Sequence, residues 1–378
     1  MKVLVCFGTR PEAIKMASIV QKLKGSPSFP VKVCVTAQHR EMLDQVLNFF
    51  EIVPDYDLDI MKENQTLNEL CGRIFTKIDS VLQDNNPDVV LVHGDTTTSS
   101  VCAWAAFHRG IKIAHVEAGL RTFDKFSPFP EELNRQITSR ICDYHFAPTS
   151  QSEQNLLNEN IRQESILVTG NTVIDSLLWA AEKLDSGYTN SKIAELKSVL
   201  NFNKKIILVT GHRRENFGEG FLSICKALAY LAQNNDIEIV YPVHLNPQVQ
   251  KPVMELLSGI SNIHLIAPLD YPSFIWMMQN SYVIITDSGG VQEEAPSLGK
   301  PVLVMRETTE RPEAVSEGTV ILVGTNADKI IAEAQNLLNN ESDYEKMSRA
   351  HNPYGDGKAA SRIVEFLENK STTANLKA

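Results

Sequence analysis

Short runs of β-branched and apolar residues alternate with longer helical stretches along almost the whole sequence. This rhythm constrains the fold more than any other feature, because it predicts repeated strand–helix–strand units and a mainly parallel sheet. The runs of the first half are Lys2–Phe7, Val31–Thr36, Val89–His93, Ile111–Glu117, Tyr144–Ala147 and Ser165–Thr169. Those of the second half are Lys205–Thr210, Glu238–Pro242, Asn262–Ile266, Tyr282–Thr286, Pro301–Met305 and Val320–Val323. The sequence therefore predicts an α/β protein with two doubly wound parallel sheets of similar size.

The length of 378 residues also suits two domains better than one hydrophobic core. We expect an N-terminal Rossmann-like domain over residues 1–175 and a C-terminal one over residues 176–358. The boundary is expected between Gly170 and Lys204.

Shorter segments complete the predicted outline. A helix-like segment, Ser176–Leu184, and a polar turn, Asp185–Asn190, lie inside the boundary stretch. A terminal helix is expected at about Ala359–Glu368, followed by a tail, Asn369–Ala378, that frays. We expect residues 359–378 to pack back on the N-terminal domain.

Composition excludes several classes of function. The net charge of −10, from 46 acidic and 36 basic residues, argues against nucleic acid as the main partner. No apolar run approaches the ~20 residues of a membrane span, so neither a membrane anchor nor a signal peptide is expected. The 6 cysteines form no CxxC pair, which is typical of reduced core thiols in the cytoplasm. The 9 histidines show no HExxH or paired Cys/His spacing, so we predict no metal site and no cofactor.

Polar residues follow the predicted strands at their carboxyl ends, which is where open α/β sheets bind ligands. After the first strand, Thr9 and Glu12 fit a helix capping box, and the helix N-terminus that they begin favours an anion. Arg10 and Lys15 add positive charge there, which predicts a phosphate contact rather than a plain capped helix with exposed cations. The segment matches neither the GxGxxG fingerprint nor a Walker loop.

Three carboxylates of the first half are candidates for acid–base chemistry. Asp95 follows the third strand, where it could equally serve as a helix N-cap. Glu117 closes a buried strand, where a carboxylate is costly unless it is functional or paired, for example with Arg121. Glu131 opens a helix and could serve only the helix dipole, although Arg135 at i+4 could orient it. A magnesium site at Asp95 and Glu117 would depend on the fold bringing them together.

Two segments of the second half predict an anion site. His212–Arg214 follow a glycine directly after a strand and form a compact cationic cluster, unless the arginines pair with surface glutamates. Ser288–Gly290 join a strand to a helix, and glycine lets the backbone N–H groups approach a diphosphate closely. Glu294, one turn further, could accept hydrogen bonds from a ribose diol. Arg311 is a further candidate, unless it belongs to a solvated charge run.

Together these segments resemble one family, the bacterial non-hydrolysing UDP-N-acetylglucosamine 2-epimerases. The resemblance runs in order along nearly the whole chain and rests on GTRPEAIK (8–15), HGDTTT (93–98), HVEAGLRT (115–122), PFPEELNRQ (128–136), GHRREN (211–216), TDSGGVQEEAPSLGKPVLVMR (286–306) and TERPEA (309–314). The long SGG segment and the GTRPEAIK start are specific, whereas HGD or GHRRE alone would be weak.

The resemblance implies a GT-B fold, in which two Rossmann-like domains face a central cleft, and a homodimer. It implies an isomerase that acts on UDP-N-acetylglucosamine, binds UDP, needs no cofactor and supplies cell-surface polysaccharide synthesis. The implied substrate contacts are Arg10, Lys15, Asp95, Glu117, Arg135, His212, Phe274, Ser288, Gly289, Gly290, Glu294 and Arg311. The implied catalytic residues are Asp95, Glu117, Glu131 and His212.

Two parts of the resemblance are less complete. Family members can carry a glutamine where this chain has Leu269, so a backbone contact to the uracil region would replace a side-chain contact there. Family members can also have a second, activating UDP-N-acetylglucosamine site. Its implied residues, which could equally be an ordinary polar cleft wall, are Gln38, His39, Gln65 and His244.

The reaction implied by the resemblance explains these residue types. The C2 proton is not next to a carbonyl, so elimination of UDP to a 2-acetamidoglucal, followed by re-addition, is the expected route. A basic cradle would stabilise the charge on UDP, while carboxyl groups, with Glu117 and Asp95 as the hypothesised carriers, serve the two faces of C2. The alternatives are a retaining glycosyltransferase of the same fold, a hydrolysing epimerase and a non-catalytic nucleotide-sugar sensor.

Overall fold

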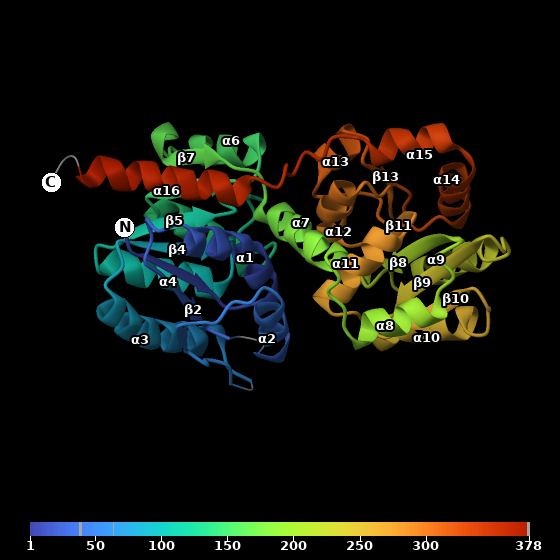
Figure 1. Ribbon diagram of the computed structural model, residues 1–378, viewed down its shortest axis with the longest axis horizontal. Helices are drawn as coiled ribbons and strands as arrows, with labels where there is room; N and C mark the ends of the chain where they lie inside the picture. Colours follow the sequence, from blue (N-terminus) through green and yellow to red (C-terminus); the bar gives the residue numbers. More distant parts are fainter. Residues whose placement is uncertain (38–39, 63, 376–378) are drawn as a thin grey trace. The chain divides into compact units, whose positions relative to one another are not determined.

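The computed structural model describes residues 1–37, 40–62 and 64–375, without the side chains of 373–375. The chain divides into two compact units (Figure 1). Unit 1 comprises Met1–Ser176 and Tyr354–Ala378, and unit 2 comprises Leu177–Pro353. Each unit contains one parallel sheet flanked by helices, so the predicted fold of two doubly wound α/β domains is confirmed.

Unit 1 is built on a seven-stranded parallel sheet in the order β3-β2-β1-β4-β5-β6-β7. The strands are β1 (Val3–Phe7), β2 (Val31–Val35), β3 (Tyr56–Asp57), β4 (Val89–His93), β5 (Lys112–Val116), β6 (Tyr144–Ala147) and β7 (Ile166–Val168). Strands β1 and β4 are buried along their whole length, as expected of central parallel strands covered on both faces. The chain changes direction across the sheet between β1 and β4, which makes this the ligand-binding switch point of a doubly wound fold.

Helices surround this sheet. They are α1 (Arg10–Gly25), α2 (Arg40–Phe49), α3 (Leu67–Asn85), α4 (Thr97–His108), α5 (Glu131–Ile141), α6 (Ser150–Asn158), the short 3-10 helix η1 (Gln163–Ser165), the start of α7 (Thr172–Asp185) and α16 (Ala359–Asn375). Helix α1 begins at the predicted capping box, in which the Thr9 hydroxyl accepts from the Glu12 N–H and the Glu12 carboxylate accepts from the Thr9 N–H.

Thr96, not Asp95, is the N-cap of α4. The carboxylate of Asp95 is therefore not used to cap that helix.

The C-terminal helix α16 returns to unit 1 and packs beside α1 (Figure 1). The Asp175 carboxylate accepts the N–H groups of Ala359 and Ala360 at 3.1 and 2.9 Å, which fixes the start of the helix. Further along, the Phe366 ring packs edge-on against Tyr144. The prediction of a frayed tail from Asn369 was wrong as far as Asn375, because the helix continues to that residue, and residues 376–378 lie outside the described residues. Lys370, whose ammonium lies over these two rings at 4.9 and 5.8 Å, extends the packing past Glu368.

Unit 2 repeats the plan with a six-stranded parallel sheet in the order β10-β9-β8-β11-β12-β13. The strands are β8 (Lys205–Thr210), β9 (Ile237–Pro242), β10 (Ile263–Ile266), β11 (Val283–Thr286), β12 (Val302–Val304) and β13 (Val320–Leu322). The helices are α8 (Ser191–Val199), η2 (Arg214–Asn216), α9 (Glu219–Leu231), α10 (Pro247–Leu257), α11 (Tyr271–Asn280), α12 (Gly289–Glu294), η3 (Ala295–Leu298), α13 (Pro312–Ser316), α14 (Ala327–Asn339) and α15 (Glu341–Ser348). The switch point of this sheet lies between β8 and β11.

Each predicted apolar run corresponds to one strand, and the strand ends lie within one residue of the predicted ends. Strand β3, with two residues, has no apolar run of its own and was not predicted. The helix predicted at Ser176–Leu184 is α7, which begins four residues earlier, at Thr172.

The cysteines belong largely to the cores. Cys6, Cys34, Cys102 and Cys225 are buried, the other two are partly buried, and none of the six forms a disulfide. Within the described residues, no helix is both long enough and apolar enough to cross a membrane.

Candidate active site

The residues singled out from the sequence gather at the carboxyl edges of the two sheets, one cluster in each unit. In unit 1 they follow β1, β4 and β5, and in unit 2 they follow β8, β11 and β12. Both clusters therefore lie at or beside the switch point of their own sheet, where doubly wound folds bind ligands.

Glu117 is the centre of the unit 1 cluster. Its Oε1 accepts from Lys15 Nζ at 2.5 Å and from Asn171 Nδ2 at 3.3 Å. Its Oε2 lies 3.2 Å from His93 Nε2. The carboxylate is thus held by Lys15 rather than by Arg121, which pairs instead with Glu159 at 2.6 Å. A nearly buried carboxylate with a cationic partner and further polar neighbours is arranged for chemistry rather than for surface pairing.

The backbone of Glu117 has a φ of +61°, in the left-handed region that side chains other than glycine rarely adopt. Such a conformation costs about 1–3 kcal/mol and persists only where the surroundings enforce it. Gly94 has a φ of +64°, and a Cβ there would lie 3.4 Å from Glu117 Oε2. The turn after β4 and the turn after β5 are therefore shaped together to present this carboxylate.

His93, beside this carboxylate, and His115, on the adjacent strand β5, are buried neutral histidines. Burial lowers the pKa of His93 to about 4, although the neighbouring Glu117 carboxylate acts in the opposite direction. Burial lowers the pKa of His115 to about 3, and its Nε2 lies 2.7 Å from the Gly94 carbonyl oxygen. Both rings are uncharged near neutral pH, so the positive charge that faces the Glu117 carboxylate is that of Lys15.

Asp95 forms a second ion pair at the same edge, with Arg135. Arg135 donates from Nε and Nη2 to Asp95 Oδ2 at 2.9 and 2.6 Å, and Asn134 donates to the Asp95 carbonyl oxygen. The suggestion that Arg135 orients Glu131 was wrong, because α5 turns Arg135 toward Asp95 and toward the buried Glu132. The Glu131 side chain, at the start of α5, forms no hydrogen bond or ion pair with another described residue.

Glu12 joins two turns of the unit 1 cluster. Its Oε2 accepts from the Gly8 and Thr9 N–H groups, and its Oε1 accepts from the Thr96 and Ser99 hydroxyls. Burial raises the pKa of Glu12, while these hydrogen bonds act in the opposite direction. Glu12 therefore serves structure, whereas Arg10, the first residue of α1, is exposed and has no side-chain partner within the described residues.

Asp287 organises the unit 2 cluster from a fully buried position. Its Oδ2 accepts from the backbone N–H groups of His212 and Arg213 at 2.9 and 2.8 Å and from Asn216 Nδ2 at 3.2 Å. Its Oδ1 lies 3.5 Å from His212 Nδ1. The carboxylate at the end of β11 thus fixes the turn that follows β8, and with it the position of the His212 ring.

The His212 ring is partly exposed and stacks on His244 with 5.4 Å between ring centroids. Partial burial lowers the pKa of His212, the nearby Asp287 carboxylate raises it, and His244 and Arg213 add to the lowering. Glu215, which could have paired with the arginines of this turn, binds Arg306 at 2.6 Å instead. The Arg213 side chain forms no hydrogen bond or ion pair with the described residues, so its charge stays at the cluster.

The Ser288–Gly290 turn leads into α12 as predicted, and Ser288 donates its N–H to the Thr286 hydroxyl. The first N–H groups of a helix have no partner within the helix and can bind an anion. At Gly289 a Cβ would lie 2.6–2.7 Å from the guanidinium of Arg311, which donates to Glu293 Oε1 at 2.7 Å. Arg311 is thus packed on the glycine turn and does not belong to a solvated charge run.

The other predicted unit 2 contacts lie on neighbouring helices. Glu294 is the last residue of α12, and the partly buried Phe274 lies in the first turn of α11. Leu269 directly precedes Asp270, which caps α11 by accepting from the Ser273 N–H at 3.0 Å.

The residues predicted for an activating site are only partly within the described structure. Gln38 and His39 lie outside the described residues. Gln65 in unit 1 contacts the Met61 sulfur, and His244 in unit 2 stacks on His212.

Sequence reasoning missed the residues that hold these groups in place. His93, Asn171, Asp287 and Glu293 each contact a predicted site residue. The sequence did contain a signal for Asp287. This residue lies between an apolar strand and the SGG segment, where a carboxylate is buried and therefore needs hydrogen-bond donors.

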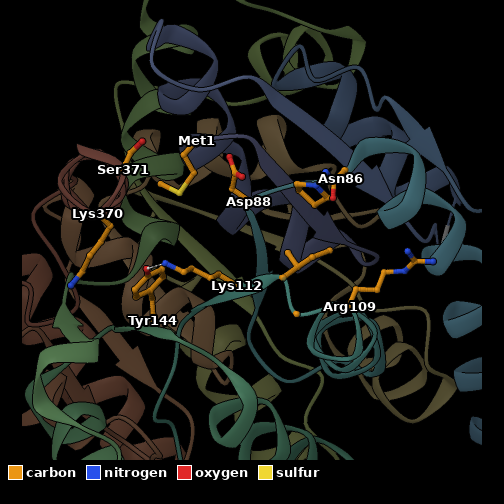
Figure 2. Close-up of a pocket in the computed structure, with 11 residues that line it drawn as sticks. Met1, Asn86, Asp88, Arg109, Lys112, Tyr144, Lys370 and Ser371 are labelled. Carbon is orange, nitrogen blue, oxygen red and sulfur yellow. Dashed lines mark hydrogen bonds between the residues drawn. The ribbon is translucent and has the colours of Figure 1, made fainter. Parts of the chain in front are cut away.

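The opposite edge of the unit 1 sheet has a different character. A pocket of about 420 Å³ lies there. It is lined by residues just before β4 and at the starts of β5 and β6, and by the end of α16 (Figure 2). Lys112 donates to the Tyr144 hydroxyl at 3.3 Å, and Lys370 lies nearby. Parallel strands bring their amino ends to this edge, so the pocket is distinct from the cluster around Glu117. Within the described residues, no group of three or more His, Cys, Asp or Glu is placed to hold a metal ion.

Fold and clusters together define a two-domain parallel α/β protein whose polar groups converge at the switch points. The family model for UDP-N-acetylglucosamine 2-epimerase matches residues 21–368. The UDP-N-acetylglucosamine 2-epimerase of Salmonella typhimurium is 59% identical over 371 residues, which cover 98% of this chain and 99% of that protein. The chain belongs to the UDP-N-acetylglucosamine 2-epimerase family.

Solved structures agree with this assignment. The UDP-GlcNAc 2-epimerase from Neisseria meningitidis, solved bound to UDP-GlcNAc, matches with a TM-score of 0.86 and 51% identity over 98% of this chain and all of that one (100%). The enzyme from Methanocaldococcus jannaschii, solved with UDP-GlcNAc and UDP, matches with a TM-score of 0.77 and 35% identity over 98% and 100% of the two chains.

Proposed function

We propose that this protein interconverts UDP-N-acetylglucosamine and UDP-N-acetylmannosamine by inverting C2, without release of the nucleotide. The observation that supports it most is the pair of carboxylates, Asp95 and the Glu117 that Lys15 holds, at the switch point of unit 1. The chain that carries them is 59% identical to a named epimerase. Binding alone would not need a strained, nearly buried glutamate. The product is proposed to supply cell-surface polysaccharide synthesis.

The nucleotide is assigned to unit 2. The backbone N–H groups of Gly289 and Gly290 and the Ser288 hydroxyl, with His212 and Arg311, are donors suited to the diphosphate, and Glu294 is suited to the ribose. Phe274 offers a ring for the base. When the C1–O bond breaks, its electron pair leaves with UDP, and preorganised donors stabilise the charge that develops there.

The sugar chemistry is assigned to unit 1. A carboxylate removes the C2 proton, and the C2–H electron pair forms the C1–C2 double bond of a 2-acetamidoglucal. A carboxylic acid then returns a proton to the other face of C2 as UDP adds back to C1. Glu117 and Asp95 are proposed as the two carriers, because each is a carboxylate held by a cation. Glu131 and Arg135 are proposed to position the sugar or to share the proton transfer, and Arg10 is proposed to contact UDP.

Incubation with UDP-N-acetylglucosamine alone tests this function. The expected product is the C2 epimer with UDP still attached, identified by liquid chromatography and mass spectrometry. Free N-acetylmannosamine with UDP would instead indicate a hydrolysing epimerase, and no reaction without an acceptor would indicate a glycosyltransferase or a sensor. The names of the relatives do not favour these alternatives.

We also propose that the enzyme is a homodimer. Trp104 and Phe107 on α4 are 43% and 55% exposed, and with Phe75 and His108 they form an aromatic patch over α3 and α4. A patch of this kind is typical of an interface. Light scattering after gel filtration should give the dimer mass, and Trp104→Glu should lower it to that of one chain.

Two narrower points complete the proposal. We propose a location in the reducing cytoplasm, and the six cysteines without disulfides support it. The activating UDP-N-acetylglucosamine site implied by the resemblance, with Gln38, His39, Gln65 and His244, stays a prediction.

A further inference from the structure

His93 is a buried residue of the unit 1 cluster for which the proposed reaction has no role. It ends β4, and its partner in the neighbouring strand β5 is Val116, so that Glu117 follows directly beside it. The side chain is 5% exposed, and its Nε2 lies 3.2 Å from Glu117 Oε2. Nε2 is buried and meets no described group at hydrogen-bond geometry, so Glu117 is the acceptor within its reach. Burying a ring nitrogen without a hydrogen-bond partner costs free energy of folding.

The charges around the ring determine what it can do there. Lys15 on α1 and Asp95 in the loop after β4 face it together with Glu117, and His115 lies on the adjacent strand. The ring is neutral near pH 7, because burial lowers the pKa of His93 to about 4. A neutral imidazole has one N–H to donate, and a carboxylate oxygen only accepts. The distance already suits a hydrogen bond, and a small ring rotation would bring the N–H into line.

We propose that His93 is a positioning residue for the proposed reaction, in which its neutral imidazole donates Nε2–H to Oε2 of Glu117. Lys15 holds the other oxygen, Oε1. Between them, the two donors fix the rotation of the carboxylate and favour its charged form, which is the form that removes the C2 proton. The inference rests on Glu117 as a proton carrier, and its test must separate the two ideas.

The matched variants are His93→Gln and His93→Met. The glutamine amide can donate from about the position of Nε2, whereas methionine is of similar size and cannot donate. We expect His93→Met to lower kcat about 10-fold or more, the scale of one hydrogen bond to a charged group, with little change in KM. The acid limb of its pH–rate profile should move to higher pH, because the charged carboxylate loses a donor. His93→Gln should recover most of kcat and restore the limb.

Glu117→Gln separates the inference from the proposed function. If Glu117 carries a proton and His93 acts through it, adding His93→Met to Glu117→Gln should change kcat less than about twofold. An inactive Glu117→Gln together with a normal rate and pH profile for His93→Met would overturn the inference alone. A normal rate for Glu117→Gln would overturn the role proposed for Glu117 itself.

Nitrogen-15 NMR of the wild-type protein gives a second reading that does not depend on the variants folding. With labelled histidine, His93 should be neutral and carry its proton on Nε2 between pH 6 and 8. The Nδ1–H tautomer would overturn the inference.

Discussion

Gly289 shows how narrowly a single residue is constrained at the nucleotide side of the site. A methyl group there would collide with the guanidinium of Arg311, whereas at Gly290 the nearest atom would be 4.0 Å away. The guanidinium is the mobile end of a long side chain, so it would move and leave Glu293. A methyl group at Gly289 should therefore weaken UDP binding more than it lowers the free energy of unfolding.

We predict that Gly289→Ala weakens UDP binding about 10-fold, which is the scale of one charge-assisted hydrogen bond. Isothermal titration calorimetry with UDP measures it. Arg311→Ala is the control, because the double variant should bind no more weakly than Arg311→Ala alone if the methyl group acts through Arg311. Unchanged UDP affinity in Gly289→Ala would contradict this arrangement.

At the scale of the element, helix α16 links the end of the chain to the core of unit 1. Leu367 is fully buried, and Ser26 at the end of α1 donates to Glu368 Oε1 at 2.9 Å. Leu367→Ala should lower the free energy of unfolding of unit 1 by about 2–5 kcal/mol. The exposed neighbour Glu365 is the matched control, and Glu365→Ala should change it by less than about 0.5 kcal/mol. Urea unfolding of both variants provides the comparison, and equal midpoints would show that α16 is not part of the core.

The elements themselves were largely predictable, because β-branched runs and capping residues are local signals. Capping at Thr9 was predicted for that reason. Strand β3 was not, since two residues at a sheet edge leave no pattern. The length of α16 also escaped prediction, because the rings that hold Lys370 belong to β6 and to the helix itself.

The site was predictable as a set of residues but not as a set of contacts. Asp95, Glu117 and Lys15 could be named from their positions after strands. The pairing of Arg135 with Asp95 rather than with Glu131 depends on how α5 lies against the turn after β4, 40 residues away in sequence. Contacts at such separations follow from the fold, and no local pattern records them.

At the scale of the whole molecule, buried histidines make stability depend on pH. His93 and His115 stay neutral when folded, with pKa values of about 4 and about 3, because burial disfavours their charged forms. Below about pH 6.5 the unfolded chain binds protons that the folded chain does not, so unfolding becomes easier as pH falls from 6.5 toward 4. Each histidine can contribute up to about 1.4 kcal/mol per pH unit in this range.

His115→Gln isolates this effect, because glutamine can still donate to the Gly94 carbonyl oxygen but does not titrate. Urea unfolding at pH 7, 6 and 5 should show a smaller loss of stability in the variant than in the wild type. The comparison removes the contributions of Glu12 and Asp175, whose pKa values are raised by burial and act in the opposite direction. Identical pH dependence in both proteins would contradict the prediction.

The central claim is that carboxyl groups of this chain exchange the C2 proton of a sugar that UDP leaves and rejoins. Proton NMR of UDP-N-acetylglucosamine in deuterated buffer tests it most directly. The account predicts that both epimers gain deuterium at C2 and are recovered with UDP linked to C1, and that Glu117→Gln slows this exchange by about 10²-fold or more. Epimer formed with its original C2 proton, or an equal exchange rate in Glu117→Gln, would contradict the account.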